Sequence, residues 1–157
     1  MQQPALTPQQ ALQKIKHYCA YQERCHSEVK EKLYGYGLNS REVEAIITQL
    51  IEEDYLNELR FAEQFAGGRF RLKQWGRVRI RYELKQRQVS DYCIKKGLQA
   101  IDADAYERTL QRLAEQKLNE LRRETNMAVK RKKLQAYLLQ KGYEPDNVRE
   151  VLRRLLP

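Results

Sequence analysis

The sequence predicts an all-α protein made of three tandem three-helix repeats in an elongated, curved arrangement. Nearly every segment carries apolar residues at the helical period, and no alternating apolar and polar run between turn residues indicates a strand. One set of six apolar positions also recurs twice along the chain, as internal repeats do. The 157 residues are 41% apolar and 32% charged, a balance typical of amphipathic helices that each bury one face.

The first helix is expected over residues 8–22. Thr7 is a suitable N-cap, Pro8 fits the first helical position and Gln10 completes a capping box. The apolar stripe of this helix consists of Ala11, Leu12, Ile15, Tyr18 and Cys19.

Two more helices follow in the first repeat. The second begins near Ser27 and stops near Gly35 and Gly37, since glycine ends helices readily. The third runs from Asn39 or Ser40 to about residue 53. Its inward positions are Val43, Ile46, Ile47 and Leu50.

The second and third helices recur along the chain. In the first repeat the pattern consists of Val29, Leu33, Leu38, Val43, Ile47 and Leu50. A shift of 51 residues gives Ile80, Leu84, Val89, Ile94, Leu98 and Ile101. A further shift of 54 gives Leu134, Leu138, Tyr143, Val148, Leu152 and Leu155. The N-cap positions of the last helices also align, at Asn39, Ser90 and Glu144.

This periodicity divides the chain into repeats at residues 1–55, 56–101 and 102–157. Their first helices are expected over 8–22, 57–72 and 102–123. A three-helix unit of this size buries little surface by itself, so neighbouring repeats should pack in series. Proteins built in this way present long surfaces to extended partners.

Positive charge is concentrated in two segments of a chain whose net charge is +9. Residues 69–87 hold eight Lys or Arg against one acidic residue, and residues 122–141 hold seven against one. Residues 1–68 are slightly acidic. Because such a concentration of like charge repels itself, the two basic segments indicate a polyanionic or acidic partner.

Aromatic and basic residues alternate around residues 55–87. Phe61 and Phe65 are expected in the core, and Trp75, followed by Gly76, is expected to lie wedged between helices. We expect the basic residues to bind the partner, although a solvated face is the alternative. The candidates in the first basic segment are Arg69, Arg71, Lys73, Arg77, Arg79, Arg81, Lys85 and Arg87. Those in the second are Lys130, Arg131, Lys132 and Lys133, which point in different directions on a helix.

Along the helix that begins near Gly76, Ile80 and Leu84 mark the inward stripe. Arg77, Arg81 and Lys85 recur every four residues along one edge of that stripe and are expected to face the partner.

Catalytic and metal chemistry are not indicated. The chain has no phosphate-binding glycine loop, no HExxH motif and no nucleophile elbow, so we expect no enzyme and no cofactor. His17, Cys19, Cys25 and His26 match no standard zinc spacing, and the three cysteines are expected to be reduced and structural. Without a membrane span or a signal peptide, the expected location is the cytoplasm.

The middle of the chain resembles the signature of the RecX regulatory proteins. The resemblance is carried in order by Leu56, Asn57, Glu58, Leu59, Arg60, Phe61 and Ala62, then Arg69, Trp75, Gly76, Arg79, Ile80, Arg81, Glu83 and Leu84. The residues treated as structural within this motif are Arg60, Phe61, Ala62, Phe65, Trp75, Gly76, Ile80, Glu83 and Leu84. The chain departs from the family at Asn57, where an acidic residue is common, and at Gln88, where glycine is frequent.

The resemblance implies three tandem three-helix repeats and a non-enzymatic, monomeric modulator of the RecA recombinase. Such a protein would bind the groove of RecA filaments on single-stranded DNA and limit filament growth, ATP hydrolysis and strand exchange. Its binding to single-stranded DNA alone would be weak and non-specific. The alternatives are a stand-alone DNA-binding protein of helix-turn-helix type, and an adaptor that uses its helical faces only.

Overall fold

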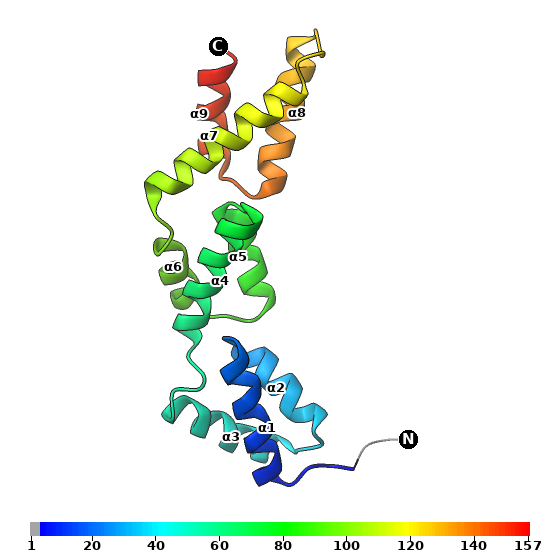
Figure 1. The fold of residues 1–157 in the computed structure, drawn as a ribbon, viewed down its shortest axis with the longest axis vertical. Coiled ribbons are helices and arrows are strands. Elements are labelled where there is room, and N and C mark those ends of the chain that lie inside the picture. The colour runs from blue at the N-terminus through cyan, green and yellow to red at the C-terminus, as the bar shows by residue number, and fades with distance from the viewer. Residues whose placement is uncertain (1–3) are drawn as a thin grey trace. The chain divides into compact units, whose positions relative to one another are not determined.

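The structure, a computed structural model, describes residues 4–157. Within this range the chain forms nine α-helices and no strand (Figure 1), which confirms the all-α prediction. The helices are α1 (Pro8–Tyr21), α2 (His26–Gly35), α3 (Ser40–Glu52), α4 (Glu58–Lys73), α5 (Arg77–Gln86), α6 (Asp91–Gln99), α7 (Ala103–Glu120), α8 (Met127–Lys141) and α9 (Pro145–Leu155). Among the described residues, no helix combines the length and the apolar character needed to cross a bilayer.

The chain divides into two compact units. The first contains the residues up to Gln64 together with Leu84–Gly97, and the second contains Phe65–Glu83 and Leu98–Pro157. Helices α4, α5 and α6 therefore each contribute residues to both units. The repeat boundaries at residues 1–55, 56–101 and 102–157 stay a prediction.

In the first unit, α1, α2 and α3 pack around a shared core. The capping box predicted for α1 is present, since Gln10 N donates to Thr7 Oγ1 at 3.2 Å. The structure also has one at α3, where Glu42 N donates to the expected N-cap Asn39 Oδ1 at 2.8 Å. The core consists of Ala11, Ile15, Cys19, Val29, Leu33, Leu38, Val43, Ile46, Ile47, Leu50 and Leu56. It contains most of the inward positions read from the helical period, while Leu12 and Tyr18 are only partly buried.

The repeat is visible in the backbone as well as in the core. Gly37, Gln88 and Gly142 occupy equivalent places after α2, α5 and α8, and their φ angles are 90°, 61° and 101°. A left-handed residue at this position ends each helix and leads into the next one. Gln88 adopts this conformation although it lacks the freedom of glycine, which is frequent here in the family.

In the second unit, α8 contacts both α7 and α9 at the C-terminal end of the chain (Figure 1). Leu134, Leu138, Val148 and Leu152 are buried as the repeat predicts, whereas the last position differs because Leu156 is buried and Leu155 only partly so. Three aromatic side chains complete this core: Tyr106 lies 5.7 Å from Phe70 and 5.1 Å from Tyr143, ring centre to ring centre.

Candidate functional site

The segment between α4 and α5 fixes the position of the only tryptophan. Gln74 ends α4 in a left-handed conformation with φ 59°, and Trp75 N donates to Arg69 O at 3.4 Å. Gly76 N then donates to Lys141 O at 2.9 Å, which joins the start of α5 to the end of α8. The backbone of Trp75 is therefore held on both sides, and its side chain has a defined place in the second unit.

Trp75 and Phe65 contact arginines instead of being fully buried. The guanidinium of Arg79 lies 4.3 Å from the Trp75 ring centre, and that of Arg69 lies 5.6 Å from Trp75 and 4.6 Å from Phe65. All four side chains are half-buried. The expectation of a core position is correct for Phe61, which is 5% exposed, but wrong for Phe65, which is half-buried. Guanidinium groups lie within cation–π distance of the rings of Phe65 and Trp75.

Arg77 takes part in a buried polar junction. One of its guanidinium nitrogens lies 3.0 Å from Glu144 Oε2, and its guanidinium carbon lies 3.8 Å from the ring centre of Tyr106. Arg77 N donates to the Tyr106 hydroxyl at 3.0 Å, and this hydroxyl donates to Glu144 Oε1. Burial, together with the hydrogen bond to Glu144, raises the pKa of Tyr106 well above its usual value. Arg77 thus belongs to an internal network, and Glu144 uses its side chain there instead of capping α9.

The glycine of the Trp-Gly pair allows two backbones to touch. A Cβ atom on Gly76 would lie 2.3 Å from the carbonyl oxygen of Gly142, and Val78 N donates to this oxygen at 2.9 Å. The free N–H groups at the start of α5 are therefore matched with the free carbonyls at the end of α8. The Tyr143 hydroxyl donates to Gln74 O at 3.0 Å and so adds a second link between the segment after α8 and the end of α4.

Several other candidates of the first basic segment are exposed. Arg71, Lys73 and Arg81 lie on the surface of the second unit and make no ion pair with any described residue. In the first unit Lys85 is also exposed, whereas Arg87 is half-buried and its carbonyl oxygen accepts a hydrogen bond of 2.7 Å from Ser27 Oγ. Of the edge formed by Arg77, Arg81 and Lys85, only the last two side chains face solvent.

The second basic cluster spreads around α8, as expected for four consecutive helical residues. Arg131 donates to Leu156 O at 2.5 Å, and Lys133 lies 3.6 Å from Glu124. Lys132 is exposed and Lys130 is half-buried. The structure does not bring these four side chains together on one surface.

The motif residues of the first unit have structural partners. Asn57 Oδ1 accepts from Arg60 N at 2.9 Å, so this asparagine caps α4. The Arg60 side chain lies 2.5 Å from Glu23 and 3.1 Å from Asp54, and the hydrogen bond to Glu23 raises its pKa. Ala62 is completely buried because Gly97 of α6 lies against its carbonyl group. The pairing of Arg60 with Glu23 links residues far apart in the sequence, and neither the helical period nor the charge count indicates it.

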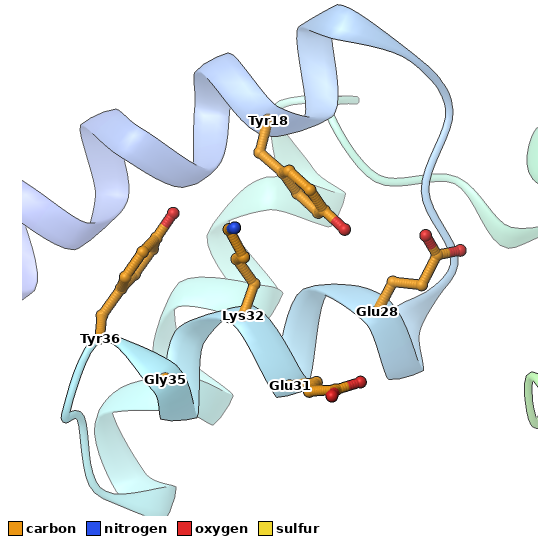
Figure 2. A pocket seen from close by; sticks show the side chains of 6 residues that line it. All are labelled: Tyr18, Glu28, Glu31, Lys32, Gly35 and Tyr36. Atoms are coloured by element: carbon orange, nitrogen blue, oxygen red, sulfur yellow. The ribbon is translucent and has the colours of Figure 1, made fainter.

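A hollow of the first unit lies between α1 and α2, and sequence reasoning did not anticipate it. Figure 2 shows its lining, in which Lys32 points between the rings of Tyr18 and Tyr36 while Glu28 and Glu31 lie to one side. Its volume is about 610 Å³ and it is widely open to solvent. Because Arg24 and Lys32 lie 3.7 Å and 5.3 Å from the centre of the Tyr18 ring, this ring already has cationic neighbours.

Among the described residues, neither a metal-binding cluster nor a cysteine pair provides a further candidate site. Among residues 4–157, no three His, Cys, Asp or Glu side chains lie close enough together to hold a metal ion. Cys19, Cys25 and Cys93 are free and buried, and burial raises the pKa of Cys19 to about 11. A thiol with this pKa stays protonated and unreactive near neutral pH.

Residues 57–98 match the family model described as the second three-helix domain of RecX, and residues 104–152 match the third three-helix domain. The curated protein "Regulatory protein RecX" from Pelodictyon phaeoclathratiforme is 32% identical over 85% of this chain and 82% of its own length. This chain belongs to the RecX family. The RecX match covers α4 to α6 and α7 to α9, and therefore includes the arginines around Trp75 and the junction at Gly76.

RecX proteins of different lengths share this similarity. "Regulatory protein RecX" from Clostridium tetani is 32% identical over 82% of this chain, yet this chain spans only 59% of that protein. The crystal structure of RecX from Lactobacillus salivarius has a TM-score of 0.86, covers 94% of this chain and 96% of its own, and is 22% identical. This likeness confirms that the RecX fold is present.

Proposed function

We propose that this chain is a negative modulator of the RecA recombinase. It binds in the groove of RecA filaments on single-stranded DNA and limits filament growth, ATP hydrolysis and strand exchange. The observation that carries the proposal is the match of two successive three-helix domains to RecX, whose curated relatives are named regulatory proteins. The absence of catalytic motifs from the sequence fits a regulator that acts by binding.

The charge distribution supports a filament as the partner. The chain has a net charge of +9, and Arg71, Lys73 and Arg81 of the second unit point their charges to solvent. DNA phosphates and acidic protein surfaces both attract such residues, and the attraction weakens as salt rises. A repeating helical protein also suits a partner whose own surface repeats.

The test is a titration of the chain into RecA, single-stranded DNA and ATP at substoichiometric ratios. We expect slower ATP hydrolysis and shorter filament lifetimes. Unchanged hydrolysis and lifetime over a wide titration would contradict the proposal. The control is the same titration with the Arg81→Glu variant, which should need a higher concentration for the same effect, beside Arg149→Glu, which changes an exposed arginine outside both basic segments.

A stand-alone DNA-binding role is separated by a second measurement. A helix-turn-helix protein binds a specific duplex far more tightly than other sequences, typically by a factor of about a thousand or more. The proposed modulator should bind duplexes of different sequence with similar, salt-sensitive affinity. Tight, sequence-selective binding without RecA would favour the alternative.

A further inference from the structure

Two guanidinium groups share one aromatic ring in the second unit. Arg79 and Arg69 lie 4.3 Å and 5.6 Å from the centre of Trp75, and Arg69 also lies 4.6 Å from the centre of Phe65. We call Arg69, Trp75 and Arg79 the tryptophan clamp. Arg69 lies in the C-terminal half of α4, and Arg79 lies in the first turn of α5.

The clamp holds two cations that have no anionic partner among residues 4–157. Neither Arg69 nor Arg79 forms an ion pair or a side-chain hydrogen bond there, although both side chains are half-buried. Arg77, the other half-buried arginine of α5's first turn, pairs with Glu144. The two clamp arginines therefore differ from Arg77 in that their charge is available to an outside anion, and pairing a partly desolvated cation is favourable.

The stacking leaves the right atoms available. Neither guanidinium donates a side-chain hydrogen bond to a described residue, so the five N–H groups of each can donate to a ligand. The ring also limits the rotamers of the arginine, which reduces the entropy lost on binding. Planar, pre-oriented donors of this kind bind phosphate oxygens in pairs.

The surroundings favour a polyanion over a single small anion. Residues 69–83 contain six Lys or Arg and one acidic residue, and Arg71, Lys73 and Arg81 are exposed in the same unit. Tyr82, one turn after Arg79 on α5, is 60% exposed. Charges spaced along a surface with an exposed aromatic ring are the usual means of binding a single-stranded nucleic acid without sequence preference.

We infer that the tryptophan clamp binds the phosphodiester backbone of single-stranded nucleic acid, with Arg69 and Arg79 contacting phosphates and Trp75 fixing their orientation. Tyr82 offers a ring to a neighbouring base. The inference rests on the proposed function and deepens it, because it assigns this surface to the strand and not to the protein of the filament. Arg69 and Arg79 are thus the contacts, and Trp75 is a positioning residue.

The experiment uses the full chain without RecA and a labelled oligothymidylate. Trp75 is the only tryptophan, so its emission reports on the clamp directly. We expect the emission to change along the same binding curve as the anisotropy of the oligonucleotide. In the Arg69→Gln/Arg79→Gln variant, affinity at about 50 mM salt should fall about tenfold or more. The slope of log affinity against log salt should become shallower by about 1.4, since each phosphate contact on a single strand contributes about 0.7.

Two matched variants separate the clamp from general charge. Arg149→Gln/Arg153→Gln removes the same charge from exposed positions of α9 and should leave affinity within about twofold. Arg69→Lys/Arg79→Lys keeps the charge but loses the paired donors. It should therefore bind several-fold more weakly with nearly the same salt slope. Circular dichroism and thermal unfolding confirm that each variant is folded.

Four results would overturn the inference. The first is no binding of the oligonucleotide, and the second is binding without any change in Trp75 emission. The third is an affinity of the Arg69→Gln/Arg79→Gln variant equal to that of the α9 control. The fourth is a change in Trp75 emission of equal size with a simpler anion. With polyglutamate at the same charge concentration, it would indicate a site for an acidic protein surface. With inorganic phosphate at the same phosphate concentration, it would indicate a site for a small anion. RecA inhibition is measured in a separate assay. Loss of oligonucleotide binding with intact RecA inhibition would contradict this inference alone, and the reverse result would contradict the proposed function alone.

Discussion

Gly76 and Gly142 lie backbone against backbone where the start of α5 meets the end of α8. A Cβ atom on Gly76 would come within 2.3 Å of the Gly142 carbonyl oxygen, and one on Gly142 would come within 2.3 Å of Arg79 Cβ. Gly142 also has a φ of 101°, which other residues rarely adopt. The glycine of the Trp-Gly pair therefore sets the distance between two helix ends, and through them the place of the tryptophan clamp.

Substitution of Gly76 by alanine should destabilise the protein by at least about 2 kcal/mol, because backbone atoms cannot move aside as a flexible side chain can. Chemical denaturation with circular dichroism measures the change. Gly68→Ala on α4 is the matched control, since nothing lies within 4 Å of its added Cβ. This variant should be stabilised by about 0.5–1 kcal/mol from helix propensity alone. Equal effects of the two substitutions would contradict the close contact.

Gln88 provides the opposite case. It has a φ of 61° where the equivalent positions of the other repeats hold Gly37 and Gly142. Gln88→Gly should therefore raise the free energy of unfolding by up to about 1 kcal/mol, as relief of the left-handed strain exceeds the added chain entropy of glycine. Gln135→Gly, at an exposed position within α8, should lower it by about 1 kcal/mol. Destabilisation in both variants would show that Gln88 is not strained.

The contrast between Gln88 and Arg77 shows what the sequence can predict. Helical period and repeat spacing locate the helices and the left-handed ends, because these depend on residues near each other in the chain. The place of Arg77 on one edge of α5 predicts that it faces the partner. Its actual neighbours, Tyr106 and Glu144, are 29 and 67 residues away, and no local pattern reveals them. The core position expected for Phe65 is wrong for a different reason: Phe65 is only half-buried, and its neighbour Arg69 lies one turn further along α4.

Tyr106 should make stability depend on pH in alkaline solution. Burial raises the pKa of Tyr106 well above its usual value, so the folded state keeps a proton that the unfolded state releases above about pH 10. Its contribution is complete below that pH and declines as the pH rises further. The Tyr106→Phe variant should lose stability less steeply above pH 10 than the wild type, although it is less stable at neutral pH by about 1–3 kcal/mol.

The two phenylalanines of α4 should differ in their contribution to stability. Phe61 is 5% exposed, so Phe61→Ala should cost about 3–5 kcal/mol. Phe65 is half-buried beneath Arg69, and Phe65→Ala should cost only about 1–2 kcal/mol. Denaturant midpoints at constant slope measure both values. A larger loss at Phe65 than at Phe61 would mean that the stacked arginine contributes more than burial does.

Charge reversal along α5 separates stability from partner binding. Arg77→Glu would place a carboxylate next to Glu144 in a junction where both side chains are less than one-third exposed, and should destabilise the second unit by about 2 kcal/mol. Arg81→Glu changes an exposed side chain without an ion pair among the described residues and should alter stability by less than about 0.5 kcal/mol. Weaker RecA inhibition by Arg81→Glu at unchanged thermal stability would therefore report on binding alone. If the Arg77→Glu and Arg81→Glu variants were equally stable, the contacts of Arg77 with Tyr106 and Glu144 would contribute nothing measurable to stability.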